Sequence, residues 1–394
     1  MMSNILIVHG GGPTVVINSS LYGAIMEAKK NKEVKAIYGA LGGTAGFLNE
    51  DFVDFMKEPQ EKIELLKTTP ATAIGTSRTP LYEKEYNKMI EILQKYDIKY
   101  VLFNGGNGTM DACGNLAKLA KEYDIKVMGI PKTIDNDLAV TDHSPGFGSM
   151  AKYIATSVSE VAQDIKSMPI HVSIIETMGR NVGWITAASV LARRKKDDAP
   201  HMILLPEVPF KEEEFLIKVE ELYNKLGGVV IVASEGLKDE KGQPIVKPIF
   251  KTERATYFGD VGSYLAELVI KKLGIKARSE KPGIVARACV TLQSSVDREE
   301  AIEVGREAIK AAMNGYTGMM VGINRISNVP YKCEYNLIPI EKVMMDEKVM
   351  PKEFIHESGY DVTDAFIKYC KPLIGEDIPH YAFFERTKEV SKKI

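Results

Sequence analysis

Short runs of apolar, mostly β-branched residues alternate with segments of helical character along this chain, and this alternation limits its fold more than any other feature. In the first part of the chain the strand-like runs are residues 5–9, 34–38, 100–103 and 126–130. Residues 18–30 and 110–123 lie between such runs and have helical character. Strands and helices that alternate at this spacing are typical of βαβ units, so the pattern predicts a parallel sheet.

The same alternation continues beyond the middle of the chain. Residues 171–175, 202–205, 228–233 and 284–285 have strand character, and residues 183–193 have helical character. The pattern therefore predicts a second α/β unit.

Composition excludes several classes of protein. The 394 residues include 51 Lys and Arg against 53 Asp and Glu, a formal net charge of −2, so the chain lacks the basic surface of a nucleic-acid-binding protein. No apolar run approaches the ~20 residues of a membrane-spanning helix. The N-terminus enters a strand-like run and then glycines, without the features of a signal peptide. We expect no nucleic acid or membrane as a partner, and a cytoplasmic location.

Cysteines and histidines give no sign of a disulfide framework or a zinc site. The four cysteines are far apart and form no C-x-x-C, and the six histidines form no H-x-x-x-H. We expect reduced thiols and no dedicated zinc site.

Three glycine-rich loops follow strand-like runs, at residues 9–13, 74–78 and 104–109. Glycine allows the backbone to approach a phosphate closely, and a helix that begins at such a loop offers N–H groups to an anion. A single glycine at a tight turn needs no ligand, but three loops, one of which carries Arg78, favour a phosphate site. The chain has neither a P-loop nor a G-x-G-x-x-G fingerprint, so this site is of another type.

An acidic loop follows the strand-like run that ends at Pro131. Thr133, Asp135 and Asp137 alternate along this loop, so an extended backbone would place them on one side. Two carboxylates and a hydroxyl at a strand end suit proton abstraction and metal binding. An Asx-turn with helix capping accounts for the same residues equally well.

The acidic loop also carries a family resemblance. Residues 131–137, Pro-Lys-Thr-Ile-Asp-Asn-Asp, resemble the catalytic signature of the phosphofructokinase family. Other blocks resemble the family's motifs in the same order: glycines 11–12 followed by Asn18, Gly-Thr-Ser-Arg at 75–78, Gly-Gly-Asn-Gly-Thr at 105–109, Glu-Thr-Met-Gly-Arg at 176–180 and Ala-Ser-Glu-Gly at 233–236. The resemblance spans residues 5–325 and continues more loosely into the tail.

The resemblance implies a role for each matching residue. Asp135 is expected to accept the proton of the sugar 1-hydroxyl, with Thr133, Lys132 and Arg180 as the other catalytic residues. The donor-phosphate residues implied are Gly11, Gly12, Arg78, Gly106, Asn107, Gly108 and Thr109. The sugar-phosphate residues implied are Thr133, Asp135, Met178, Gly179, Arg180, Glu235, Arg278 and Arg287, and those implied for Mg²⁺ are Asn107 and Asp137.

Two positions bear on the phosphoryl donor. Family members that use pyrophosphate generally have Asp where this chain has Gly108, and that carboxylate repels the α-phosphate of ATP. Lys132 is usual in pyrophosphate enzymes but also occurs in some ATP-dependent members that combine it with glycine. Leu41 and Thr79 stand where ATP enzymes offer aromatic rings to the nucleoside, which favours pyrophosphate. The glycine leads us to expect ATP, with pyrophosphate as the alternative.

The resemblance implies a 6-phosphofructokinase of glycolysis that forms fructose 1,6-bisphosphate. Its fold is expected to be α/β, with two Rossmann-like lobes, parallel-rich sheets and the active site between them. The donor lobe is expected to comprise residues 1–147 and 288–340, with 318–322 as a returning strand. The sugar-phosphate lobe is expected to comprise 148–287 and 341–394, with a helical tail.

Further expectations concern the oligomeric state, the sugar phosphate that accepts the phosphoryl group and two alternative functions. The resemblance implies a homodimer or homotetramer in which Arg278 serves a neighbouring subunit's site; an exposed surface charge is the alternative for this residue. Fructose 6-phosphate and sedoheptulose 7-phosphate share the geometry of the reacting group. A non-catalytic family member is disfavoured because Asp135, Asp137 and Arg180 are present, and a dinucleotide-binding dehydrogenase because its glycine fingerprint is missing.

Overall fold

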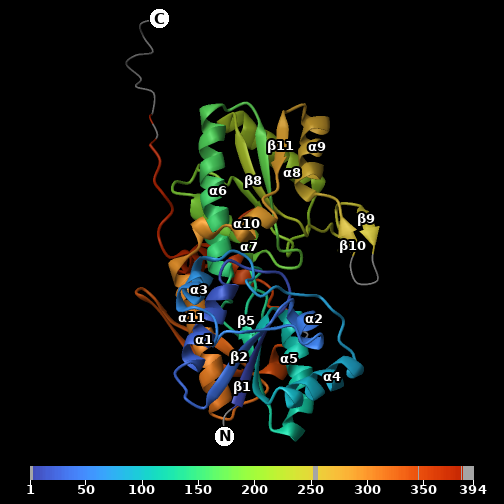
Figure 1. Cartoon of the computed structure of the whole chain (residues 1–394). Coiled ribbons are helices and arrows are strands. Elements are labelled where there is room, and N and C mark those ends of the chain that lie inside the picture. The colour runs from blue at the N-terminus through green and yellow to red at the C-terminus, as the bar shows by residue number, and fades with distance from the viewer. Residues whose placement is uncertain (1–2, 252–255, 345, 383, 385–394) are drawn as a thin grey trace, which may run out of the picture.

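The computed structural model describes residues 3–251, 256–344, 346–382 and 384. Two sheets lie one above the other, each covered by helices (Figure 1). The larger sheet has seven strands in the order β13-β12-β5-β4-β1-β2-β3. These strands are β1 (Ser3–His9), β2 (Val34–Ala40), β3 (Phe52–Asp54), β4 (Ile98–Gly105), β5 (Lys126–Pro131), β12 (Met319–Asn328) and β13 (Tyr331–Pro339).

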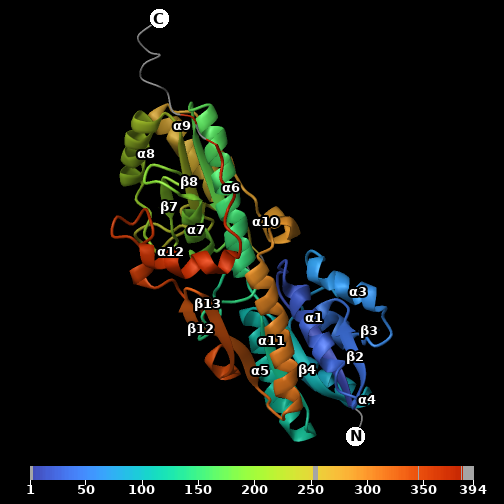
Figure 2. The same cartoon turned by 90° about the vertical axis from the view of Figure 1, so that its left-hand side faces the viewer.

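The central strands of the larger sheet are parallel, and β3 and β13 pair antiparallel at its two edges. Its helices are α1 (Ile17–Ala28), α2 (Gly43–Leu48), α3 (Gln60–Glu64), α4 (Glu83–Lys95), α5 (Asn107–Ala120) and α11 (Ser295–Met313). One core packs between the sheet and α4 and α5. The other packs between the sheet and α1 and α11, two helices that lie side by side (Figure 2). Strand β12 shows that the run at 318–322 returns to the first sheet, as predicted.

The smaller sheet has four parallel strands in the order β11-β6-β8-β7. These strands are β6 (Val172–Thr177), β7 (Met202–Leu204), β8 (Val229–Ser234) and β11 (Ala277–Glu280). Its helices are α6 (Phe147–Ser167), α7 (Trp184–Ala188), α8 (Glu212–Leu226), α9 (Val261–Leu273) and α10 (Ile284–Ala288). One core lies between the sheet and α8 and α9, and another between the sheet and α6 and α7. The predicted α/β fold with two lobes and parallel-rich sheets is confirmed.

The tail covers the smaller lobe with α12 (Asp364–Cys370), whose apolar side chains pack with those of α6 and α7. Residues 345, 383 and 385–394 of the expected helical tail lie outside the described residues. A two-stranded arm consists of β9 (Pro248–Lys251) and β10 (Thr256–Phe258). Short 3-10 helices occupy Leu65–Thr68, Lys121–Tyr123, Ser189–Ala192, Val290–Leu292, Ile340–Lys342, Lys352–Phe354 and Lys371–Ile374.

The prediction of a strand at residues 284–285 is wrong. Ile284 and Val285 begin α10, and 68% of each residue is exposed, so neither belongs to a buried strand. The strand at this point of the chain is β11, at the sheet edge, and its exposed and half-buried residues alternate because successive side chains point to opposite faces of the sheet. No helix within the described ranges combines the length and apolar character needed to cross a membrane.

Candidate active site

A cavity of about 480 Å³ opens at the carboxyl ends of β1, β4 and β5, the edge at which parallel α/β sheets bind ligands. The loops after β1 and β4 form one side, and the acidic loop after β5 forms another. Met178, which follows β6, and Arg287 of α10 contribute from the smaller lobe. Thirteen predicted site residues line the cavity: Gly11, Gly12, Arg78, Gly106, Asn107, Gly108, Thr109, Lys132, Thr133, Asp135, Asp137, Met178 and Arg287.

The glycine loops after β1 and β4 lie against each other because glycine allows their backbones to approach closely. A Cβ atom on Gly105 would lie 2.2 Å from Oγ1 of Thr109 and 2.8 Å from the carbonyl oxygen of Gly10, too close for any other residue. This contact sets the start of α5, at Asn107, beside the loop that follows β1. The N-terminus of this 14-residue helix therefore lies at the cavity, where its N–H groups and dipole favour an anion.

Three cationic side chains line the same cavity as this helix N-terminus. Lys132 follows β5 directly, and its Nζ donates to the carbonyl oxygen of Gly12 at 2.5 Å. Burial lowers the pKa of Lys132 to about 8, against the opposing effect of nearby carboxylates. Arg78 comes from the glycine loop at 74–78. Nη1 of Arg287 lies 3.0 Å from the position that a Cβ atom on Gly12 would occupy. Together these groups form a positively charged surface whose chemistry suits a phosphate.

The acidic loop places two carboxylates beside these cations. The backbone N–H of Asp135 donates to Oγ1 of Thr133 at 3.1 Å, which fixes the start of the loop. Burial raises the pKa of Asp135 to about 7, and the negative charges of Asp137 and Glu235 add to this rise. Burial likewise raises the pKa of Asp137, although a hydrogen bond with Thr133 opposes the shift. A carboxyl group with a pKa near neutrality is suited to proton transfer.

The residues expected to hold Mg²⁺ lie in direct contact. Nδ2 of Asn107 donates to Oδ2 of Asp137 at 2.9 Å. The Oδ1 atoms of Asn107, Asp135 and Asp137 are buried and have no hydrogen-bond partner in the described chain. Mg²⁺ prefers oxygen ligands and commonly takes one or two carboxylates, with phosphates and water completing its shell, so these residues fit the ion. Among the described residues no group of three or more His, Cys, Asp or Glu is placed to hold a metal alone.

Gly179, Arg180 and Glu235 do not line the cavity but lie on two turns beside it. Oγ of Ser234 donates to the carbonyl oxygen of Gly179 at 2.7 Å, which joins the turn after β6 to the turn after β8. Gly236 permits this contact, since a Cβ there would lie 1.7 Å from the carbonyl oxygen of Arg180. Nη1 of Arg180 donates to the carbonyl oxygen of Thr256 at 3.3 Å. These residues therefore border the cavity through Met178.

Arg278 is not brought to the cavity within one chain. It is exposed on the edge strand β11, where it pairs in register with Ser173 of β6. Burial and the charge of Arg278 lower the pKa of His171, so these two residues are neighbours.

Several residues in and behind the site have no local signal in the sequence. Thr44 and Leu81 line the cavity, and Lys348 contacts the acidic loop from the tail. Leu41 does not line the cavity, and no aromatic residue does so among the described residues. Asn136 stands inside the acidic motif and has φ 56, a left-handed conformation in which Asn is enriched; that preference is the only hint of its structural part.

Comparison with known proteins gives three concordant findings. A family model described as "Phosphofructokinase" matches residues 4–312. The "Pyrophosphate--fructose 6-phosphate 1-phosphotransferase" of Rhodospirillum rubrum is 36% identical over 400 residues, covering 98% of each chain, and that of Xanthomonas campestris is 39% identical over 388 residues, covering 95% of this chain and 92% of the relative. The crystal structure of the pyrophosphate-dependent phosphofructokinase from Marinobacter aquaeolei has a TM-score of 0.88 at 36% identity and covers 97% of this chain and 94% of its own.

Proposed function

This chain belongs to the phosphofructokinase family, and we propose that it transfers a phosphoryl group from pyrophosphate to the 1-hydroxyl of fructose 6-phosphate. The observation that carries the proposal is the convergence in one cavity of the cations Arg78, Lys132 and Arg287 with the carboxylates Asp135 and Asp137. Phosphoryl transfer depends mainly on positioning and on stabilising the charge of the transferring group, and these side chains are suited to both.

Pyrophosphate replaces ATP as the proposed donor. The names of the relatives from R. rubrum and X. campestris support it, and so does the lack of an aromatic ring among the described residues that line the cavity. The expectation of ATP rested on Gly108. A Cβ atom added to this glycine would have no other atom within 4 Å. Open space beside Gly108 is compatible with ATP but does not by itself favour it. The names of the relatives are therefore the stronger argument about the donor.

In the proposed reaction Asp135 is the general base that accepts the proton of the 1-hydroxyl as that oxygen attacks one phosphorus of pyrophosphate. The bridging P–O bond of pyrophosphate breaks, inorganic phosphate leaves, and fructose 1,6-bisphosphate is formed. The raised pKa of Asp135 suits a base that works near neutral pH. Lys132, Arg78 and the N-terminus of α5 hold the donor phosphates and offset their charge. Asn107 and Asp137 would hold Mg²⁺, which supplies further neutralisation of the phosphates when bound.

The proposed acceptor site borders the smaller lobe. Arg287 lies in the cavity and is placed to bind the 6-phosphate, while Met178, Arg180 and Glu235 would contact the sugar from their two turns. Arg278 is exposed and outside the cavity of its own chain, so we assign it to a neighbouring subunit's site in a homodimer or homotetramer. A role in glycolysis, in the cytoplasm, is part of the same proposal.

Steady-state kinetics with Mg²⁺ test this proposal. Fructose 6-phosphate is offered with pyrophosphate and, in parallel, with ATP, and sedoheptulose 7-phosphate is then offered with whichever donor is used. We expect turnover with pyrophosphate and fructose 6-phosphate. Turnover with ATP alone would overturn the donor assignment, and a higher kcat/KM for sedoheptulose 7-phosphate would overturn the acceptor assignment.

A further inference from the structure

Lys348, from the tail segment before α12, makes four polar contacts with the acidic loop. Its Nζ donates to the carbonyl oxygen of Asp142 at 2.7 Å, to Oδ1 of Asn136 at 3.1 Å and to the carbonyl oxygen of Thr141 at 3.3 Å. Its backbone N–H donates to the carbonyl oxygen of Asp137 at 2.8 Å. One side chain thus uses all three of its ammonium hydrogens on one loop.

Asn136, which Lys348 contacts, separates the two carboxylates of the site. The left-handed backbone conformation of Asn136 sets the directions in which the chain carries the flanking residues Asp135 and Asp137. A conformation of this kind persists only where neighbouring groups hold it. The Asn136 side chain is fully buried: Oδ1 accepts from Lys348 and from the N–H of Ser144, and Nδ2 donates to the Tyr369 hydroxyl at 2.9 Å. The tail therefore supplies two of the three contacts that hold this residue.

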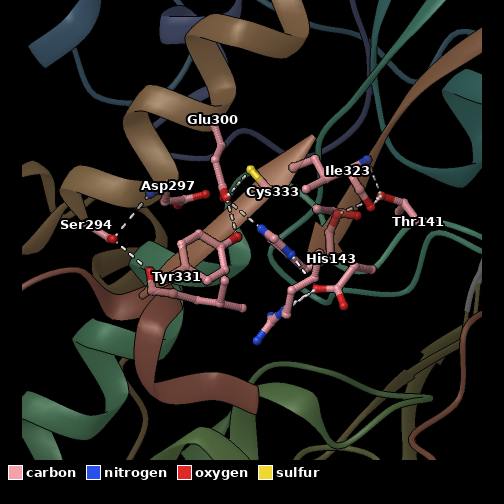
Figure 3. Close-up of polar contacts among 12 residues, drawn as sticks. Thr141, His143, Ser294, Asp297, Glu300, Ile323, Tyr331 and Cys333 are labelled. Carbon is pink, nitrogen blue, oxygen red and sulfur yellow. Dashed lines mark hydrogen bonds and ion pairs between the residues drawn. The ribbon is translucent and has the colours of Figure 1, made fainter. Parts of the chain in front are cut away.

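The far end of the loop is anchored to a buried network on α11 and β13, which Figure 3 shows. His143 lies between Oδ2 of Asp142 and Oε2 of Glu300, at 2.7 Å from each. The Tyr331 hydroxyl also bonds to Glu300. Thr141 is held by the backbone of Ile323 on β12. Lys348 therefore connects Asn136, which lies between the two carboxylates, to residues 141–142, which are held in place by contacts with α11 and β12.

The same tail segment contacts the turn between β6 and α7. Nδ2 of Asn181 donates to Glu347 at 2.9 Å, and Nε1 of Trp184 donates to the carbonyl oxygen of Lys348 at 3.0 Å. This turn, residues 178–183, contains Met178 and Arg180. Residues 347–348 therefore lie between the loop with the proposed base and the turn with the proposed sugar contacts.

We propose that Lys348 is a positioning residue for phosphoryl transfer, which holds the loop carrying Asp135 and Asp137 in one conformation and ties it to the turn after β6. The inference rests on the proposed function, because positioning matters only if these carboxylates react. Lys348 does not line the cavity, and its contacts are with Asn136 and the loop backbone, so it would act through them.

The variant Lys348→Met removes the donors and keeps the length of the side chain. Because small displacements of a reacting group strongly slow an enzyme, we expect kcat to fall roughly 10- to 100-fold, with KM for pyrophosphate and fructose 6-phosphate within about threefold of wild type. Asn136→Gly removes the clamped side chain but tolerates the left-handed backbone. We expect the loss of kcat in the double variant to be smaller than the product of the two single losses, because the two variants share the contact between Lys348 and Asn136.

Lys152→Met is the matched control. Lys152 is also largely covered, with a side chain 13% exposed, but it pairs with Glu376 and donates to the carbonyl oxygen of Gln293, away from the loop. We expect its kcat to stay within about twofold of wild type. Unchanged kcat in Lys348→Met, an equal loss in Lys152→Met, or additive losses in the double variant would each overturn the proposal.

Amide hydrogen exchange tests the positioning without any turnover. We expect faster exchange over residues 136–144 in Lys348→Met and unchanged exchange in Lys152→Met. Wild-type exchange over this loop in Lys348→Met would overturn the positioning role. If the wild-type protein transferred no phosphoryl group with any donor, the proposed function would fail while this measurement still decided the role of Lys348 in holding the loop.

Discussion

Nδ2 of Asn107 donates a hydrogen bond of 2.9 Å to Oδ2 of Asp137, so the first residue of α5 touches the second of the two carboxylates that line the cavity. The contact joins the loop after β4 to the loop after β5. Each partner keeps a buried oxygen that bonds to nothing in the described chain, and the two oxygens are ready-made ligands for a hard cation.

Replacing Asp137 with Asn removes one negative charge from this pair. We expect the Mg²⁺ concentration that gives half-maximal velocity to rise at least about tenfold, since affinity for Mg²⁺ depends on carboxylate charge. A magnesium titration at saturating substrates measures this. Asp54→Asn, at the end of β3 where Asp54 pairs with Lys57 away from the cavity, is the control and should show the wild-type requirement. An unchanged requirement in Asp137→Asn would remove this residue from the metal site.

Replacing Asp135 with Asn removes the proposed base with little change of shape. Loss of a general base typically costs ~10²–10⁴ in rate, so we expect kcat to fall by this factor while pyrophosphate still binds. Steady-state kinetics measure the first effect and calorimetric titration with pyrophosphate the second. A kcat within tenfold of wild type would assign the proton transfer to another group.

Replacing Gly108 with Asp tests the space beside the donor phosphates. The added side chain meets open space, and its charge lies at the N-terminus of α5, so the fold is expected to accept it. Any turnover with ATP should disappear because of repulsion from the α-phosphate, while turnover with pyrophosphate stays within about threefold. Parallel assays with the two donors measure this, and unaltered ATP kinetics would contradict it.

Replacing Arg287 with Met tests the proposed 6-phosphate contact. A hydrogen bond to a charged group contributes about 1.5–3 kcal/mol, so we expect KM for fructose 6-phosphate to rise roughly 10- to 100-fold, with a smaller change for pyrophosphate. Arg298→Met, which removes an arginine paired with Glu299 on α11, is the control. The opposite pattern, a rise in KM for pyrophosphate alone, would place Arg287 with the donor.

Stability at alkaline pH tests the buried network behind the loop. Burial acts to lower the pKa of His143, but the charge of Glu300 and the hydrogen bonds with Asp142 and Glu300 outweigh it and raise the pKa to about 9. A histidine whose pKa is raised by folding stabilises the folded state, and this stabilisation is fully present below the unfolded pKa of ~6.5. For His143 it is on the order of 3 kcal/mol and is lost as the pH rises through about 9.

Unfolding of wild type and His143→Gln at pH 6.5 and pH 9.5 isolates this contribution. We expect wild type to lose more stability than the variant between the two pH values, because only wild type loses a charged imidazole. Parallel losses in the two proteins would show that His143 does not carry the pH dependence.

The sequence predicted those parts of the fold and of the site that depend on residues close together in the chain. The glycine loops after β1 and β4 and the acidic loop after β5 could be placed at one sheet edge because each follows a strand, and parallel strands end at the same edge. The prediction that the glycine loop at 74–78 also follows a strand is wrong, since the element before it is the 3-10 helix Leu65–Thr68. Residues 284–285 were misassigned because a short apolar run has no period to separate a strand from a helix. The contact between Lys348 and Asn136 spans 212 residues, and nothing near either residue in the sequence announces it.

The tail contacts also set the order in which a working site can form. Asp135 is synthesised early, but Asn136 beside it is held by Lys348 and by Tyr369, which follow more than two hundred residues later. During translation at about 5–20 residues per second, the nascent larger sheet waits at least ten seconds or so for these partners to leave the ribosome. The contacts that hold Asn136 therefore cannot form until the tail has been synthesised, and the acidic loop lacks these supports for most of the time that the chain is on the ribosome.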